Sequence, residues 1–214
     1  MSLSKKMIKV VLASDSQRRR DLVPYLTGKY SFASPKVEEI INPNLSPAEA
    51  AMDLADKKAR SVFHKRMLQE VIVIGCDTII VLDGVIYGKP KNLNDARQMI
   101  RKLQGKTHKV ITGVSFINQI YNETFYVESE VTIKRLTDYA VEEYLKAADY
   151  LEYAGGYALQ DRDFNIVESY KGSASNIIGF PLEKIGERYL NRVDKKIRRL
   201  EIDRKYREIY GDDD

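Results

Sequence analysis

Apolar residues along this chain follow two patterns: short continuous runs, and longer stretches with apolar positions every three or four residues. The runs at residues 8–13, 71–75 and 79–82 are rich in β-branched side chains and end at polar or turn residues. Such runs are typical of buried strands. The dipeptide Asp83-Gly84 follows the third run, so residues 85–87 are expected to return antiparallel in a hairpin.

Helical spacing follows three capping signals. Ser-Pro-Ala-Glu at residues 46–49 is a capping box with proline at the first helical position. The helix that it opens carries a narrow apolar stripe, made of Met52, Ala55, Ala59, Val62 and Phe63. Asn94 and Thr137 are expected to begin two further helices, and another helix is predicted from Leu182 onward.

The remaining strands predict the fold class. Residues 108–114 and 126–134 are expected to pair antiparallel, and residues 157–160 predict a short strand that returns through residues 164–169. With the hairpin, these pairs argue against a purely parallel sheet. We therefore expect an α/β fold with a mixed, long twisted sheet flanked by helices, and two lobes around a central cleft. The chain 1–214 is expected to form a single domain that ends in a charged helical extension at residues 195–214.

Composition narrows the class of protein. With 214 residues, 43% of them apolar, the chain can build one sizeable core or two small lobes that share one. The net charge of +4 does not require a nucleic-acid partner but suits an anionic ligand. The single cysteine, Cys76, excludes an internal disulfide framework and favours a reducing compartment. No apolar run approaches the roughly 20 residues that span a bilayer, so we expect a cytoplasmic protein with no membrane partner.

The first candidate site surrounds the predicted hairpin. Asp77 lies between two apolar runs, where an unpaired carboxylate would be costly. Lys89 follows the hairpin and can return close to it. An acid and a lysine at the edge of a sheet suggest a site for a metal and a phosphate. Because Mg²⁺ is commonly held by few carboxylates together with substrate phosphates, it suits such a site.

A second candidate site follows the first predicted strand, where hydroxyls and arginines precede a helix. Ser14 or Ser16 can cap that helix while its backbone N–H groups point at an anion. Arg18 and Arg19 can bind phosphate oxygens bidentately. The alternative is a solvated basic first turn. We disfavour it because cations are unfavourable near a helix N-terminus, so the arginines are expected to need an anion.

Two other polar residues have competing interpretations. Lys58 lies on or beside the apolar stripe of its helix, and a lysine there commonly lays its stem on the core and extends its ammonium group to solvent. The acidic pair Glu38-Glu39 lies in a predicted loop, where such pairs are usually solvated. His108 stands alone in sequence and is interpreted as structural.

The segment GCDTIIVLDGVIYGKP, followed by a helix and THKVITGV, resembles the Maf family of nucleotide pyrophosphatases. The family pattern Ser-x-Ser-x-Arg-Arg matches Ser14, Ser16, Arg18 and Arg19, and LADKKA matches its lysine motif at Lys58. Further family positions match at the end of the acidic stretch, in TGV, and after the double glycine, namely Glu39, Thr112 and Gln160.

The resemblance implies an architecture like that of inosine triphosphatases, a homodimer, and hydrolysis of a nucleoside triphosphate to monophosphate and pyrophosphate. It implies Mg²⁺ or Mn²⁺ bound by Asp77 and Glu39. Residues with implied catalytic roles are Asp77, Lys58, Lys89, Arg18, Glu39 and Gln160. Residues with implied substrate-binding roles are Ser14, Ser16, Arg18, Arg19, Lys58, Thr78, Lys89, Thr112 and Gln160.

Substrate preference divides the family into branches. This chain has Asp77-Thr78 and a Tyr-x-x-Gln that ends at Gln160, which is similar to the branch that prefers dTTP and UTP. A branch with Asp-Gln instead prefers 7-methyl-GTP. The chain departs from the family pattern at Asp15, Gln17 and Asp161, and Asp15 adds a negative charge near the expected phosphates.

Three alternatives remain open from the sequence. One is a 7-methyl-GTP pyrophosphatase of the same family. Another is a nucleotide-binding regulator of cell division without turnover, against which Asp77, Lys58 and Lys89 speak. The third is a nucleic-acid-binding module that uses the charged C-terminal segment, although mixed charge at helical spacing more often marks a solvated helix.

Overall fold

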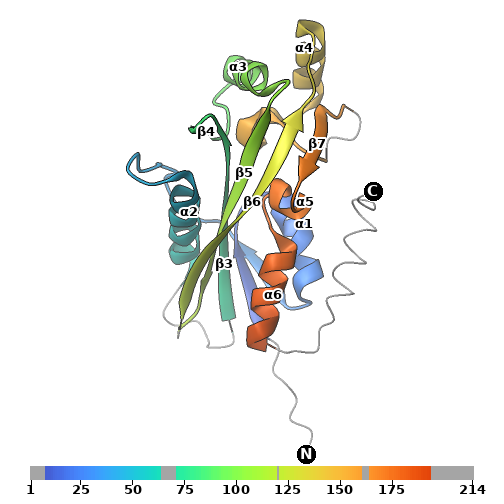
Figure 1. Ribbon diagram of the computed structural model, residues 1–214. Helices are drawn as coiled ribbons and strands as arrows, with labels where there is room; N and C mark the ends of the chain where they lie inside the picture. The colour runs from blue at the N-terminus through green and yellow to red at the C-terminus, as the bar shows by residue number, and fades with distance from the viewer. Residues whose placement is uncertain (1–7, 64–70, 120, 161–163, 194–214) are drawn as a thin grey trace, which may run out of the picture.

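The computed structural model describes residues 8–63, 71–119, 121–160 and 164–193, in which helices flank one mixed sheet (Figure 1). The strands are β1 (Lys9–Ala13), β2 (Tyr30–Ala33), β3 (Val71–Leu82), β4 (Val85–Tyr87), β5 (Thr107–Ile117), β6 (Asn122–Ile133) and β7 (Val167–Lys171). The α-helices are α1 (Gln17–Leu26), α2 (Pro47–Val62), α3 (Leu93–Leu103), α4 (Asp138–Ala147), α5 (Ala174–Ile178) and α6 (Leu182–Val193). Two short 3₁₀ helices, η1 (Tyr150–Glu152) and η2 (Ala154–Gly156), follow α4.

The sheet confirms the predicted mixed pairing. Its strands run in the order β2-β1-β3-β5-β6-β7, and β4 pairs with β3. β1 is parallel to both of its neighbours, and the other pairs are antiparallel. The predicted hairpin turn lies at Asp83 and Gly84, whose φ angles of 51° and 77° are those that a two-residue hairpin loop requires.

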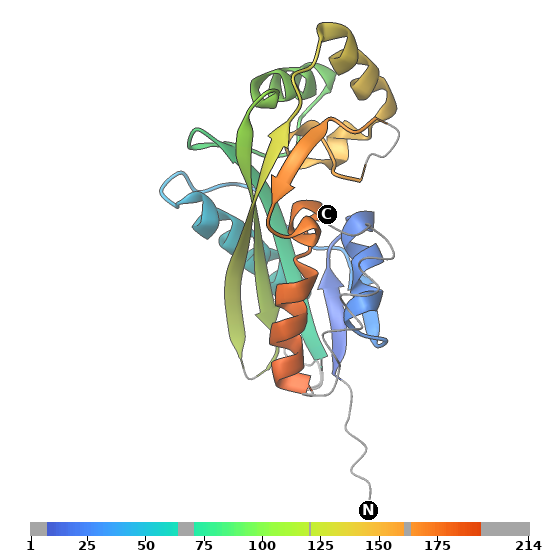
Figure 2. The same ribbon diagram turned by 45° about the vertical axis from the view of Figure 1, so that its right-hand side comes forward.

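The long strands β3, β5 and β6 run through two lobes, as predicted. The first lobe gathers β1, β2, α1, α2 and α6, and the second gathers α3, α4 and β7 (Figures 1 and 2). β3 contributes to the core of each, with Ile72 and Ile74 in an apolar cluster of the first lobe and Ile80 and Leu82 in one of the second. Asp77 lies between these pairs, so the change from one core to the other falls at a polar residue.

Helix α2 lies unusually close to the sheet because glycines face it. A Cβ atom added at Gly75 would lie 2.2 Å from the carbonyl oxygen of Ala55, and one added at Gly113 would lie 2.2 Å from that of Ala51. The small side chains of Ala51, Ala55 and Ala59 on α2 are fully buried, which allows the same close packing from the helix side. This close approach brings the helix near enough for Lys58 to reach the middle of β3.

Of the capping predictions for α2, α3 and α4, two are confirmed and one is wrong. Ser46 forms the expected capping box with Glu49, and Thr137 accepts a hydrogen bond from the backbone of Ala140. Helix α3 begins before Asn94, because Asn92 is its N-cap and accepts a hydrogen bond of 3.0 Å from the backbone N–H of Asp95.

The predicted strand at residues 157–160 is wrong. These residues follow Gly155 and Gly156, which both have positive φ, and residues 159 and 160 form a turn. The backbone N–H of Ala158 donates to the Tyr144 hydroxyl instead of to a strand. The returning strand starts later than expected, at Val167, and β6 rather than residues 157–160 is its partner.

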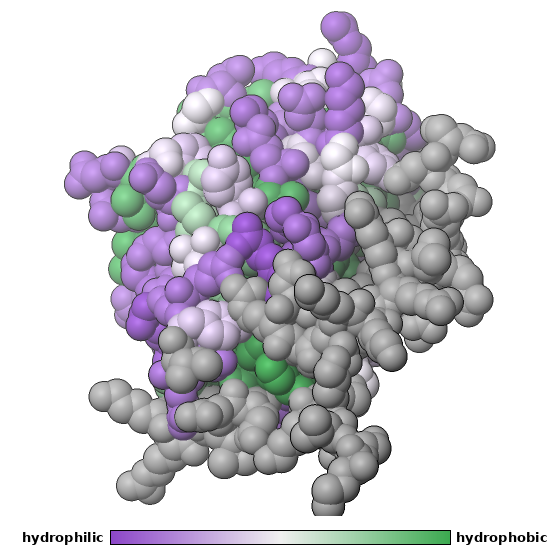
Figure 3. Space-filling view, turned by 60° about the horizontal axis from the view of Figure 1, so that its bottom comes forward, coloured by the Kyte–Doolittle hydropathy of each residue, from purple (hydrophilic) through white to green (hydrophobic). Residues whose placement is uncertain are grey.

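The surface of the described residues is mainly polar. In Figure 3, purple hydrophilic side chains predominate among the described residues, and green apolar side chains show between them in several places. None of the helices in the described ranges is both long enough and apolar enough to cross a membrane. The helical extension predicted at residues 195–214 lies outside the described residues.

Candidate active site

A cavity of about 440 Å³ opens between the two lobes. Its walls come from the β1–α1 connection, the segment before α2, the middle of β3 and the segments around β4 and η1. The sequence-predicted residues that line it are Ser14, Ser16, Arg18, Arg19, Glu39, Lys58, Asp77, Thr78 and Lys89. The fold therefore brings most of the predicted residues to one place.

The cavity floor holds one ammonium group between two carboxylates. Lys58 Nζ lies 2.5 Å from Asp77 Oδ1 and 2.7 Å from Glu39 Oε1. Lys58 and Asp77 are buried, with 5% and 4% of their surface exposed, whereas the Glu39 side chain is 54% exposed. The interpretation of Lys58 as a lysine that extends to solvent is wrong, because its ammonium group lies inside the protein.

The two carboxyls differ in acidity because their burial differs. Burial raises the pKa of Asp77 above its ordinary value, against the attraction of Lys58 and Arg19. Burial also acts to raise the pKa of Glu39, but there Lys58, Arg19 and Lys89 outweigh it and the pKa is lowered. Asp77 is therefore the carboxyl better suited to accept a proton, and Glu39 the one that stays ionised.

Arg19 connects α1 to the middle of β3 and to the segment between α5 and α6 through hydrogen bonds. Its Nε donates to the carbonyl oxygen of Gly179 at 2.8 Å, and its Nη2 donates to Thr78 Oγ1 at 2.9 Å. Thr78 lies 3.0 Å from Thr112 Oγ1, which in turn donates to the carbonyl oxygen of Asn176. These bonds hold the side chain of Arg19 against the cavity wall.

Arg18 and Lys89 both bind the segment at η1, at the edge of the cavity. Arg18 Nη2 donates to the Glu152 carbonyl oxygen at 2.9 Å, and its guanidinium lies 4.4 Å from the centre of the Tyr153 ring. Lys89 Nζ lies 2.8 Å from Glu152 Oε2. Sequence reasoning missed Glu152, because an acid in an irregular segment before a double glycine carries no periodic or motif signal.

The carboxylate of Asp15, a residue that departs from the family pattern, is paired with a cation of the same chain. Its Oδ1 lies 3.0 Å from Arg20 Nη2, and its Oδ2 accepts a hydrogen bond of 2.6 Å from Ser34 Oγ. Arg20 also donates to the Ser14 carbonyl oxygen. Arg20 therefore has an anionic partner within the protein, whereas the expectation that Arg18 and Arg19 bind an anion stays a prediction.

The expected serine cap of α1 is also absent. Ser16 occupies the N-cap position, but its side chain makes no capping hydrogen bond within the described chain. Ser14 Oγ instead accepts a hydrogen bond of 3.2 Å from the backbone N–H of Ser16. The N-terminus of this helix thus meets the cavity without a side-chain cap, which is an arrangement that favours anions.

Two predicted residues lie outside the lining of the cavity. Thr112 and Gln160 are not among the described residues that line it. Thr112 hydrogen-bonds to Thr78, whereas the side-chain oxygen Oε1 of Gln160 is buried without a hydrogen-bond partner in the described chain. The roles assigned to Thr112 and Gln160 stay predictions.

His108 is buried, as its structural interpretation requires. Its Nε2 lies 2.6 Å from the Tyr157 hydroxyl, and burial lowers the pKa of His108 to about 4. The imidazole is therefore neutral at physiological pH. Tyr157 lines the cavity, so this pair fixes one wall of it.

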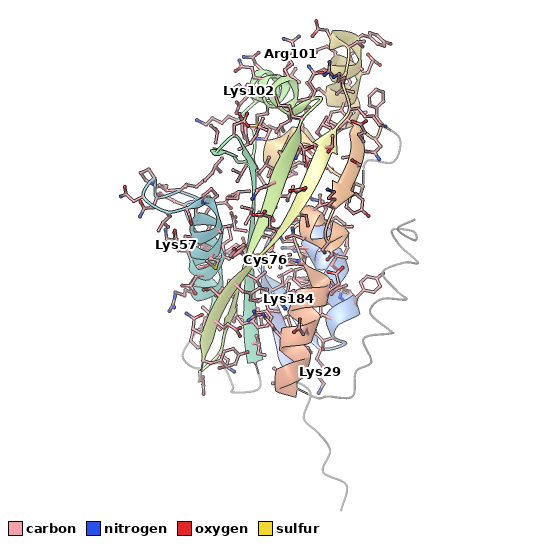
Figure 4. The ribbon with its side chains drawn as sticks, in the orientation of Figure 1. Lys29, Lys57, Cys76, Arg101, Lys102 and Lys184 are labelled. Carbon is pink, nitrogen blue, oxygen red and sulfur yellow. The ribbon has the colours of Figure 1, made fainter. Side chains whose placement is uncertain are left out.

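Cys76 has no place in the chemistry of the cavity. Its side chain is fully buried in the middle of the sheet (Figure 4), and burial raises the pKa of the thiol to about 12. A thiol with that pKa is almost entirely protonated near neutral pH and is a poor nucleophile. The prediction that Cys76 packs as a small apolar residue agrees with this environment.

The carboxylates suit a divalent cation that shares its ligands with a substrate. Within the described ranges, no three His, Cys, Asp or Glu side chains form a group that could hold a metal alone. Asp77 and Glu39 share Lys58 as a partner, so their oxygens are close to one cationic centre. Mg²⁺ commonly takes one or two carboxylates and completes its shell with phosphates and water, which this donor set allows.

The fold and cavity define an α/β protein with a cation-lined site for a phosphorylated ligand. A family model described as "Maf-like protein" matches residues 9–191. A protein named dTTP/UTP pyrophosphatase from Bacillus pumilus is 37% identical over 178 residues, which cover 83% of this chain and 93% of that relative. A Thermotoga maritima protein of the same name is 38% identical over 175 residues, covering 82% and 85%. This chain belongs to the family of Maf-like proteins.

Among solved structures, the Ham1 protein of Staphylococcus aureus matches with a TM-score of 0.42 and 13% sequence identity. The match covers 94% of this chain and 98% of that one.

Proposed function

We propose that this protein hydrolyses nucleoside triphosphates to nucleoside monophosphates and pyrophosphate. The observation that carries the proposal is the buried Lys58 ammonium between Asp77 and Glu39, at the floor of a cavity that Arg18, Arg19 and Lys89 also line. This arrangement offers a proton acceptor and several cations to one polyanionic ligand. The relatives named dTTP/UTP pyrophosphatase support the same reaction.

The proposed reaction is water attack at the α-phosphorus. Asp77, whose pKa burial raises, accepts the proton of the attacking water. The water oxygen joins the α-phosphorus as the bond to the bridging oxygen breaks, and pyrophosphate leaves with that oxygen. Lys58 holds Asp77 in place and opposes the charge of both carboxylates. No covalent intermediate with the protein is needed.

Mg²⁺ or Mn²⁺ is the proposed cofactor. Asp77 and Glu39 would hold the cation, which when bound would supply positive charge to the phosphate oxygens. In the free protein, Lys58 pairs with both carboxylates. The two negative charges therefore have a cationic partner before a metal ion binds.

The leaving pyrophosphate is stabilised by positive groups that line the cavity. The N-terminus of α1 meets the cavity at Ser16 and can bind phosphate oxygens through its backbone N–H groups. Arg18, Arg19 and Lys89 spread and neutralise the charge that moves toward the leaving group. Because Asp15 is paired with Arg20, its carboxylate opposes this field only weakly.

We propose dTTP or UTP as the preferred substrates. The relatives' names support this, and so does Thr78, whose side chain lies on the cavity wall. In this proposal the Thr78 hydroxyl pairs with the imide edge of a pyrimidine. Gln160 does not line the cavity of the free protein, so its amide would have to turn toward the base, where its side-chain oxygen Oε1 would gain the donor that it lacks within the described chain. A homodimer in the cytoplasm is the proposed working form.

The experiment that tests this function is a panel of triphosphates with Mg²⁺, scored for released pyrophosphate. We expect pyrophosphate from dTTP or UTP, with kcat/KM at least about tenfold above that for 7-methyl-GTP, or roughly 1.4 kcal/mol in transition-state binding. A preference for the methylated purine would overturn the substrate while leaving the reaction. Tight nucleotide binding without turnover would instead support a regulator, and salt-dependent DNA binding would support a nucleic-acid module.

A further inference from the structure

We propose that Glu152 is an internal competitor for the phosphates of the ligand, and that it weakens the retention of pyrophosphate. The inference rests on the proposed function, because it takes Lys89 and Arg18 as the groups that bind the pyrophosphate part of the substrate. Glu152 would lower the affinity of the site for that product and so speed its release.

The geometry places one segment across both cations. The Glu152 carboxylate accepts a hydrogen bond of 2.8 Å from Lys89, and its backbone carbonyl accepts one of 2.9 Å from Arg18. The adjacent Tyr153 ring lies under the guanidinium of Arg18. Lys89, Arg18 and Glu152 all line the cavity, so an anion that enters meets cations already bound to an acidic segment.

The pair between Lys89 and Glu152 is one that a ligand can displace. Their side chains are 50% and 57% exposed, and pairs between such exposed groups are weak because water and salt screen them. Pyrophosphate offers several charged oxygens to the same lysine. The buried pair of Lys58 and Asp77, with side chains 7% and 6% exposed, differs, because separating it would leave two buried charges.

The site thus contains a fixed lysine and an exchangeable one. Lys58 is bound to carboxylates that belong to the floor, whereas Lys89 is bound to a carboxylate that occupies the place of an anionic ligand. When pyrophosphate binds, Glu152 must give up Lys89 and its charge remains close to the new anion. When pyrophosphate leaves, the carboxylate returns to Lys89. Both effects lower affinity for the product without adding or removing any catalytic group.

The test is calorimetric binding of inorganic pyrophosphate, at fixed Mg²⁺, to the full chain and to two variants. Glu152→Gln keeps the shape of the side chain and removes its charge. Glu143→Gln makes the same charge change in an acid that pairs with Lys146 on α4 and is not among the described residues lining the cavity. We expect Glu152→Gln to bind pyrophosphate about fivefold more tightly, the effect of losing one exposed ion pair, and Glu143→Gln to match the wild type.

A second measurement separates this role from a structural one. Glu152→Gln should lower the KM for the triphosphate and the inhibition constant of pyrophosphate together, while the melting temperature stays at the wild-type value. The gap between wild type and variant should shrink as salt rises. Equal pyrophosphate affinity in all three proteins, or an equal gain in both variants, overturns the proposal.

The binding experiment does not depend on turnover. If the protein binds pyrophosphate but forms none from any triphosphate, the proposed function fails while the comparison of variants still decides the role of Glu152. If triphosphates are hydrolysed and Glu152→Gln gains no affinity, the function stands and the internal competitor is rejected. If none of the three proteins binds pyrophosphate, the competitor is rejected as well.

Discussion

Lys58 Nζ lies 2.5 Å from Asp77 Oδ1, and both side chains are buried in the middle of the protein. The contact joins the interior face of α2 to β3 at the point where the two lobes meet. It depends on the glycine and alanine contacts that bring the helix to the sheet. The same pair therefore couples the fold of the protein to its proposed chemistry.

Removal of Lys58 should destabilise the protein more than removal of the Asp77 charge. Lys58→Met leaves Asp77 buried without its cation, so we expect a loss of about 3–5 kcal/mol in the free energy of unfolding. Asp77→Asn should cost less, because Lys58 keeps Glu39 as a partner. Denaturant unfolding of both variants measures this difference.

The matched control for that prediction is the neighbouring lysine. Lys57 lies on the outer side of α2 (Figure 4) and pairs with Asp53 through a side chain that is 45% exposed. Lys57→Met should change the free energy of unfolding by less than about 1 kcal/mol. Similar losses for Lys57→Met and Lys58→Met would show that the buried pair has no special role.

The close packing of α2 makes a second prediction. In Gly75→Ala the new Cβ would meet the Ala55 carbonyl oxygen at 2.2 Å, so the helix must move away from the sheet. We expect a loss of about 1–3 kcal/mol in the free energy of unfolding. We also expect kcat to fall, because Lys58 moves with the helix and leaves its position beside Asp77. Gly28→Ala is the control, since nothing lies within 4 Å of a Cβ at Gly28. Unchanged kcat in Gly75→Ala would refute the coupling.

Sequence patterns predicted the parts of the fold that depend on local chemistry. The turn at Asp83-Gly84 and the capping box at Ser46 carry their own signals, and both are confirmed. The region after α4 was mistaken for a strand because Tyr157 and its apolar neighbours resemble one. Its backbone is in fact directed by the positive φ angles of Gly155 and Gly156 and by the Tyr144 hydroxyl, neither of which a periodic pattern reveals.

The candidate site also has parts that the sequence predicts and parts that it does not. Asp77 and Lys58 could be proposed from residue type and family motif, because a carboxylate in a buried run and a lysine on an apolar stripe both conflict with their surroundings. The partners of the arginines could not be proposed in that way. Arg18 binds the carbonyl of Glu152, which lies 134 positions later in the chain, and only the three-dimensional fold brings these residues together.

Burial of His108 predicts a loss of stability in acid. The folded protein holds the pKa of His108 at about 4, below the value of 6.5 expected in the unfolded chain. Stability from this residue is therefore complete above pH 6.5 and is lost as the pH falls from 6.5 toward 4. The loss should approach roughly 3 kcal/mol.

His108→Gln tests that contribution, because glutamine can hydrogen-bond to the Tyr157 hydroxyl but does not take up a proton. The free energy of unfolding of the variant should change less than that of the wild type between pH 7 and pH 4. Identical pH profiles for the two proteins would place the acid sensitivity elsewhere.

Loss of the Asp77 carboxylate should abolish most of the turnover. Asparagine keeps the size of the side chain but cannot accept the proton of the attacking water. We expect kcat to fall at least about a hundredfold in Asp77→Asn, the range seen when a general base is removed. Asp53→Asn on the exposed side of α2 is the control and should keep wild-type kcat. Turnover of Asp77→Asn within a few-fold of the wild type would contradict its role.

The site of water attack is the most direct test of the proposed reaction. Hydrolysis of dTTP in ¹⁸O-labelled water, followed by mass analysis of both products, shows which phosphorus receives the water oxygen. Attack at the α-phosphorus predicts one labelled oxygen in dTMP and none in pyrophosphate. Label in pyrophosphate, or release of inorganic phosphate in place of pyrophosphate, would contradict the proposed chemistry at Asp77.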